Sequence, residues 1–333
     1  MGMKTLILWL LQRPPLNNRV RYLRKLVHGL AVVGVACSLA FAQAKRSPES
    51  HDVSITAVSE PGAVVWIDDV RYGKTGADGK FTIKTVARGG HKLRVRADGF
   101  KETTRTITAI QKVEIKIPLV KTDDKAELAY QEAERLLASD HDKAAVAYRA
   151  AIKLRPGYAR AYIGLARVLS EDSDTDGALA AIRDLRRTNS RNAEASAVEG
   201  RIYKDTGDEA KAIAAFKRSI TEGKGFQPEA YTGLGLLFEE RAEGLGGQGD
   251  VAKESAAYAE SARNFQVALR QLSGAPDAAV LYELLGVVLE RQKKYQAAIN
   301  LYNEFLRYFP DSSEADAVRS FIVQLKKQLN EQN

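Results

Sequence analysis

The feature that most constrains this chain is a repeat of about 34 residues in its C-terminal two thirds. Large, small and aromatic residues recur in the same order, with spacings of 34, 34, 35 and 51 residues. The five copies start at Lys125, Ala159, Ala193, Pro228 and Ala279. A period in this range is typical of stacked supersecondary units that bury apolar faces against their neighbours. The repeat therefore predicts an array of units over residues 125–310 and not one globular core.

Four copies carry a small residue at a first fixed position, and all five carry one at a second position and a bulky residue four positions after that. The small positions are Ala166, Gly200, Gly235 and Gly286, then Ala144, Ala178, Ala212, Ser261 and Ala298; the bulky ones are Tyr148, Ile182, Phe216, Phe265 and Tyr302. This pattern resembles the tetratricopeptide repeat (TPR), which implies two antiparallel helices per unit and a concave surface that binds proteins. The first copy departs most, with Gln131-Glu132 where Leu-Gly is usual.

Two further segments complete the helical part. The fourth copy carries 14 extra residues near 240–254, around a glycine-rich stretch, which predicts either a flexible loop or an extension of both helices that ends in one. Apolar residues at helical spacing within residues 311–333 alternate with charged ones. This last pattern predicts a capping helix with one solvent-facing side.

Residues 45–120 follow a different period. Apolar and polar residues alternate over 92–97 and again over 112–119, which indicates strands with one buried and one wet face. Turn signals rich in Gly, Asp and Pro separate the apolar runs. We expect six or seven short strands, most simply a small antiparallel sandwich, joined to the repeats by a linker at 121–124.

Five short motifs in this segment resemble the PEGA family. They are Pro61-Gly62-Ala63, Val65-Trp66-Ile67-Asp68, Gly73-Lys74-Thr75, Gly90-His91-Lys92-Leu93-Arg94-Val95 and Asp98-Gly99-Phe100. The first motif lacks the Glu that the family usually carries between Pro and Gly. The resemblance implies an extracytoplasmic β module without an established enzymatic role. The fold class is thus a PEGA-like all-β sandwich followed by an all-α TPR solenoid.

The N-terminus has the organisation of an export signal. Residues 19–25 are basic, 26–41 are largely apolar, and Ala42-Gln43-Ala44 offers a cleavage site. We therefore expect residues 1–44 to be a signal peptide and the mature protein to be periplasmic or secreted. An uncleaved signal would instead anchor the chain in the inner membrane, facing the periplasm. Cys37 does not follow a lipidation motif, because Gly34 stands where a Leu-like residue is required.

Charge and composition exclude several functions. Residues 1–44 carry six of the eight net positive charges, so nucleic acid is not expected as a partner. One cysteine and four histidines without ligand spacing argue against disulfides and zinc sites. Asp172–Gly177 resembles half of a calcium loop, but Arg183 occupies the position of the bidentate acid, so we interpret this segment as a turn with a helix cap. We expect no catalytic, cofactor-binding or metal-binding residues, and no enzyme.

The TPR resemblance also implies which side chains line the concave groove. Carried over position by position, they are Arg160, Ile163, Arg167, Arg201, Lys204, Glu229, Glu239, Glu283 and Glu290. One half of this set is basic and the other acidic, so a partner of opposite polarity would lie along it in one direction.

The sequence supports two functional hypotheses. The first is an exported, non-enzymatic adaptor or scaffold that binds a protein or peptide in the groove within a bacterial-type cell envelope. The second is a structural envelope module whose β domain contacts peptidoglycan or surface polysaccharide. The identity of the partner does not follow from the residues.

Overall fold

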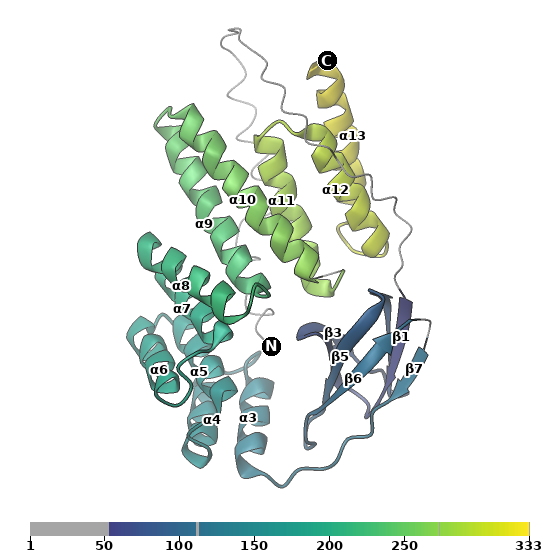
Figure 1. Cartoon of the computed structure of the whole chain (residues 1–333), viewed down its shortest axis with the longest axis vertical. Coiled ribbons are helices and arrows are strands. Elements are labelled where there is room, and N and C mark those ends of the chain that lie inside the picture. The colour runs from purple at the N-terminus through teal and green to yellow at the C-terminus, as the bar shows by residue number, and fades with distance from the viewer. Residues whose placement is uncertain (1–52, 111–112, 273, 333) are drawn as a thin grey trace.

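The computed structural model describes residues 53–110, 113–272 and 274–332, so the expected signal peptide lies outside the described part of the chain. Seven strands precede eleven α-helices and one short 3-10 helix in these residues (Figure 1). None of the described helices combines the length and the apolar character needed to cross a membrane. A β domain followed by a helical solenoid is the fold class that the sequence predicts.

The strands form two sheets. They are β1 (Val53–Val58), β2 (Val64–Ile67), β3 (Val70–Lys74), β4 (Lys80–Val86), β5 (Gly89–Arg96), β6 (Thr103–Ala109) and β7 (Val113–Lys116). The three-stranded sheet has the order β4-β1-β7 and the four-stranded sheet the order β3-β2-β5-β6. Alternate residues of β1 are buried, as the period of two predicts.

The expectation of an all-antiparallel sandwich is wrong at one strand pair. β7 runs parallel to β1, whereas β1 pairs with β4 in the antiparallel sense. The reason is topological, because β7 follows β6, which belongs to the other sheet, and the chain enters the first sheet without a hairpin. The β2–β3 connection is a tight two-residue hairpin, in which Asp68 and Asp69 have φ values of 48° and 67°.

The helices follow the repeat. They are α3 (Lys125–Leu136), α4 (His141–Leu154), α5 (Ala159–Glu171), α6 (Thr175–Thr188), α7 (Ala193–Asp205), α8 (Glu209–Glu222), α9 (Pro228–Gly247), α10 (Val251–Leu272), η1 (Pro276–Ala278), α11 (Ala279–Arg291), α12 (Tyr295–Tyr308) and α13 (Ala315–Gln332). The first helix of each unit begins at the residue where the sequence places the start of a copy. Asp or Asn side chains cap six of these helices, which satisfies backbone N–H groups of the first turn.

Small residues bring the two helices of a repeat together. A Cβ atom added at Gly200 on α7 would lie 2.6 Å from the ring of Phe216 on α8. Phe216 itself is almost fully buried, so its ring fills the space that the glycine leaves. The recurring small and bulky residues of the sequence thus meet face to face.

The extra residues of the fourth repeat extend both of its helices. α9 and α10 have 20 and 22 residues and are joined by a turn at 248–250. Of the two alternatives for the glycine-rich segment, the extension is therefore the one observed. After the fifth repeat, α13 packs on α12 through Val318, Ile322 and Leu325, which are buried.

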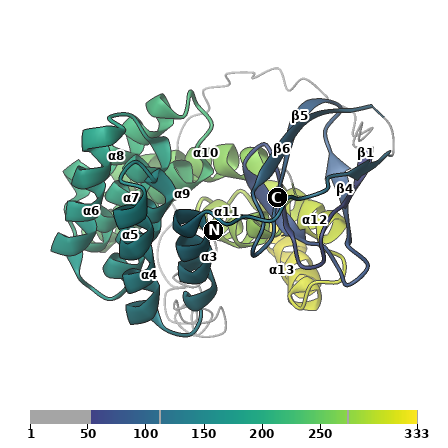
Figure 2. The same cartoon turned by 90° about the horizontal axis from the view of Figure 1, so that it is seen from below.

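The β domain lies on the concave side of the helical array. It sits between α3, at the start of the array, and the last two repeats (Figures 1 and 2). Buried apolar residues of the β domain and of the last two repeats form one continuous cluster. β3 approaches η1, and the backbone at Gly274 lies between Thr85 of β4 and Tyr308 of α12. The chain thus brings its two parts together at both ends of the array.

Candidate functional site

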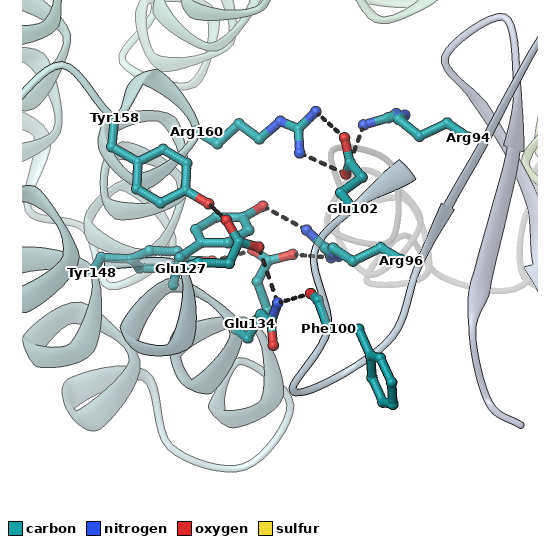
Figure 3. Close-up of polar contacts among 11 residues, drawn as sticks. Arg94, Arg96, Phe100, Glu102, Glu127, Glu134, Tyr148, Tyr158 and Arg160 are labelled. Carbon is teal, nitrogen blue, oxygen red and sulfur yellow. Dashed lines mark hydrogen bonds and ion pairs between the residues drawn. The ribbon is translucent and has the colours of Figure 1, made fainter. Parts of the chain in front are cut away.

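The β domain docks on the first repeat through a network around Arg96. The guanidinium of Arg96 on β5 donates to the hydroxyl of Tyr130 over 3.2 Å and to a carboxylate oxygen of Glu134 over 3.1 Å (Figure 3). The hydroxyl of Tyr148 donates to the other oxygen of Glu134 over 2.5 Å. Burial acts against the charge of Arg96, but Tyr130 and Glu134 outweigh it and raise the pKa of Arg96. This arginine is therefore a fixed cation at the junction.

A second contact explains why the first repeat departs from its family pattern. Gln131 accepts a hydrogen bond from the backbone N–H of Gly99 over 2.7 Å and donates one to the carbonyl of Phe100 over 3.0 Å. Gly99 has φ +82°, which the Asp-Gly-Phe turn requires and which glycine adopts without strain. A leucine at position 131 could make neither hydrogen bond. The unusual residue in α3 is thus a docking residue for the β domain.

The third contact between the β domain and the helices involves Arg160, one of the residues expected to line the groove. Arg160 on α5 forms two hydrogen bonds with the carboxylate of Glu102, 2.7 Å and 2.8 Å long, and Arg94 on β5 approaches the same carboxylate at 3.5 Å. Burial alone would raise the pKa of Glu102, but Arg160 and then Arg94 overcome it and lower the pKa. Glu102 therefore bridges two arginines from different parts of the chain (Figure 3).

Beside this junction, the β domain and the helices border a partly open cavity of about 1000 Å³. One wall is the face of the four-stranded sheet around Trp66, and the other is formed by α3, α5 and the N-termini of α7 and α9. Phe226, which is 39% exposed, and Leu272 contribute apolar surface to the lining. The volume is at the upper end of the range found for ligand sites in proteins.

The two walls of the cavity differ in charge. The sheet wall carries Arg71, Lys92, Arg94 and Arg96 against Asp68 and Asp69, and the helical wall carries Glu134, Glu171, Glu194, Glu229 and Asp277 against Arg160 and Arg167. Cations therefore exceed acids on the sheet, and acids exceed cations on the helices. A bound molecule would meet opposite potentials on its two sides.

The structure brings four of the expected groove residues to this cavity. Arg160, Ile163, Arg167 and Glu229 line it, whereas Arg201, Lys204, Glu239, Glu283 and Glu290 do not. Lys204 forms an ion pair with Glu240 at 3.0 Å, and Glu290 accepts a hydrogen bond from Tyr302 over 3.2 Å. Glu239 is buried and Glu283 is exposed.

The basic and acidic halves of the expected groove meet inside the array. Arg167 on α5 forms hydrogen bonds of 2.8 Å and 2.6 Å with Glu229 on α9 and a longer one of 3.3 Å with Glu194 on α7. Arg201 is buried beside them, and its Nη2 has no hydrogen-bond partner among the described residues. Burial, and then the like charge of Arg167, lowers the pKa of Arg201.

The sheet wall is the part of the site that the sequence analysis did not identify. Lys92, Arg94 and Arg96 alternate with buried residues of β5, which marked them only as the wet face of a strand. The guanidinium of Arg94 lies 4.4 Å from the ring centroid of Trp66, and that of Arg96 lies at 5.4 Å. The sequence signal for this wall was the row of three cations, Lys92, Arg94 and Arg96, on the polar face of one strand.

The acidic segment of the second repeat has a structural role. Asp174 caps α6 by accepting a hydrogen bond from the N–H of Gly177 over 2.9 Å. Asp172 accepts one from Nδ1 of His141 over 2.7 Å. Nowhere in the described part of the chain do three or more His, Cys, Asp or Glu side chains gather in a way that could hold a metal ion.

Comparisons with known proteins identify both parts of the chain. A PEGA domain model matches residues 50–123, and tetratricopeptide-repeat models match residues 129–202, 193–222 and 247–315. No curated protein sequence matches the chain.

Solved structures resemble the helical part in fold. Yeast Tom70 is 16% identical with a TM-score of 0.50, and the match covers 62% of this chain but only 41% of Tom70. PilF of Pseudomonas aeruginosa is 18% identical with a TM-score of 0.45, over 62% of this chain and 92% of PilF. A TPR protein of Thermus thermophilus is 15% identical with a TM-score of 0.43, over 61% of this chain and 98% of its own.

Proposed function

Because the chain combines a PEGA domain with tetratricopeptide repeats, we propose that it is an exported, non-enzymatic adaptor of a bacterial-type cell envelope. Repeats of this type are protein-interaction modules, so a protein or peptide partner is the expected ligand. Export rests on the basic, apolar and small-residue order of residues 1–44. The PEGA domain is compatible with a location outside the cytoplasm.

The observation that carries the proposal is the cavity between sheet and helices. It is bounded by both parts of the chain, and its lining mixes apolar, aromatic and charged side chains. Binding sites commonly lie at such junctions between domains. An extended segment of a partner would contact the PEGA sheet on one side and the repeats on the other. The PEGA domain is then half of the binding site and not a spacer.

Site-specific crosslinking tests this function. A photoreactive amino acid in place of Phe226, at the cavity, should capture a protein when the full chain is expressed in its native host. The matched control is Val146 on α4, which is 64% exposed and does not line the cavity. We expect a discrete crosslinked protein from position 226 and none, or a different set, from position 146.

Two results would contradict the adaptor function. One is the same set of crosslinked proteins from both positions. The other is retention of the mature chain on purified cell-wall sacculus without any protein captured at position 226, which would favour a structural module that contacts peptidoglycan or polysaccharide.

A further inference from the structure

The sheet wall of the cavity is built as one row of side chains. In the strand register, Trp66 of β2 lies opposite Arg71 of β3 and opposite Arg94 of β5. Residues that lie opposite each other in antiparallel strands share a face of the sheet. Lys92 is two residues from Arg94 on β5, so it projects from the same face. Three cations from two strands therefore share one face of the sheet with the indole ring on the wall of the cavity.

Two of these cations are not used by the fold. Arg94 pairs with Glu102, which in turn binds Arg160 of α5, and Arg96 pairs with Glu134 of α3. Among the described residues, no carboxylate forms an ion pair with the side chain of Arg71 or Lys92. The backbone N–H of Lys92 bonds to Asp68, but its ammonium group does not. Arg71 and Lys92 thus present unneutralised positive charge to the cavity.

The opposite wall repels a uniform polyanion. Glu194 and Glu229 pair with Arg167, and Arg201 is buried beside them. The acids that line this wall nevertheless outnumber its two lining cations, Arg160 and Arg167. Glu171 also lines the cavity, and its nearest basic nitrogen, Nε2 of His141, is 3.8 Å away. A sulfated or uronic polysaccharide would carry anionic groups toward this wall as well as toward the sheet. A peptide in extended form sends successive side chains to opposite sides and can satisfy both walls.

We propose that the cavity binds an extended peptide segment with acidic residues at alternating positions, which Arg71 and Lys92 recognise from the PEGA sheet. The residues between the acidic ones are apolar or basic and face the helices. Opposite charges on the two walls fix the side of the segment that faces the sheet. This inference rests on the proposed adaptor function and names the class of its partner.

The test measures peptide binding to the full mature chain by fluorescence anisotropy. The probe is a fluorescein-labelled heptapeptide of alternating Glu and Leu with blocked ends, compared with the Gln-Leu and Lys-Leu peptides of equal length. We expect the Glu-Leu peptide to bind most tightly. The double variant Arg71→Gln with Lys92→Gln should weaken it by about fivefold, as for two partly exposed ion pairs. The control Lys84→Gln with Lys153→Gln removes two exposed cations away from the cavity and should leave the affinity unchanged.

Three outcomes would overturn the inference. They are equal affinity for the Glu-Leu and Gln-Leu peptides, unchanged affinity in the Arg71 and Lys92 double variant, and tighter binding of a dextran sulfate oligosaccharide that depends on the same two residues. The crosslink at position 226 separates this failure from failure of the adaptor function. If the double variant still captures the same protein there, the adaptor function holds and only the acidic specificity is wrong.

Discussion

Arg167 on α5 and Glu229 on α9 form a buried two-point ion pair between residues that are 62 positions apart in the chain. Their side chains are only 6% and 7% exposed. Burial acts against the charge of Arg167, but Glu229 outweighs it and raises the pKa of Arg167. The pair passes over the third repeat and joins the second repeat directly to the fourth. Charges that could have faced a partner are neutralised within the array instead.

Replacing one member of this pair should be more damaging than replacing both. Arg167→Met leaves the buried carboxylate of Glu229 without its hydrogen-bonded partner and should lower the free energy of unfolding by about 3 kcal/mol. Adding Glu229→Leu should recover part of this loss, because no charge of the pair is then left uncompensated. Urea denaturation of the single and double variants measures the coupling.

The matched control for this cycle is the surface pair of Arg263 and Glu260, whose side chains are 65% and 43% exposed. Removing this surface pair should change the free energy of unfolding by less than about 1 kcal/mol. Strictly additive losses at Arg167 and Glu229 would show that the two side chains do not interact as described.

The variant Glu102→Gln should loosen the β domain from α5 of the second repeat. It removes the carboxylate that separates Arg94 from Arg160 and leaves two guanidinium groups close to each other. Because this site is partly exposed, the expected loss is only about 1 kcal/mol, but protease cleavage in residues 117–124 should become faster. Glu114→Gln is the control, since Glu114 pairs with Lys80 on the exposed surface of the same domain. Equal cleavage rates in both variants would argue against a docking role for Glu102.

Gly200 should not tolerate a methyl group. Its added Cβ would lie 2.6 Å from the buried ring of Phe216, so Gly200→Ala should lower the free energy of unfolding by about 1–3 kcal/mol through overpacking. Gly244 on α9 has no atom within 4 Å of an added Cβ, so Gly244→Ala should be neutral or stabilising by up to about 1 kcal/mol. Thermal unfolding of the two variants compares them. A destabilised Gly244→Ala with a stable Gly200→Ala would reverse the packing argument.

The contact between His141 and Asp172 should make stability depend on pH. Their hydrogen bond raises the pKa of His141 in the folded chain. The protonated form therefore stabilises the fold at a pH below the unfolded pKa of about 6.5, and this contribution is lost as the pH rises through the folded pKa. His141→Gln should lower the melting temperature more at about pH 5.5 than at about pH 8.5. An equal decrease at both values would exclude the contact as the cause, and Asp172→Asn should give the same difference as His141→Gln.

Processing of the N-terminus is a separate prediction. If Ala42-Gln43-Ala44 is the cleavage site, the exported protein begins at Lys45. N-terminal sequencing of protein purified from the cell envelope checks this directly. Membrane-bound material that begins at Met1 would instead identify a signal anchor.

The sequence predicts the elements well because their signals are local. The repeat of small and bulky residues predicts where the first helix of every unit begins, and the alternation of apolar and polar residues predicts the strands of the β domain. The docking of the two parts could not be predicted, because contacts such as Gln131 with Gly99 and Arg160 with Glu102 join residues 32 and 58 positions apart without any periodic signal. In the sequence, Gln131 is visible only as a departure from the family pattern, which does not predict its partner. The parallel pairing of β7 with β1 has no local sequence signal either.

The position of the β domain changes how the helical array can respond to force. A solenoid with free ends lengthens like a spring, because small rotations between neighbouring repeats add along its axis. Here the β domain touches both α3 and the loop before η1, so those rotations cannot accumulate unless a contact breaks. Tension applied through α13 would thus act first on the interface between the β domain and the helices, and only then stretch the repeats. The distance between the first and the last repeats is therefore set by the β domain as long as its contacts at both ends persist.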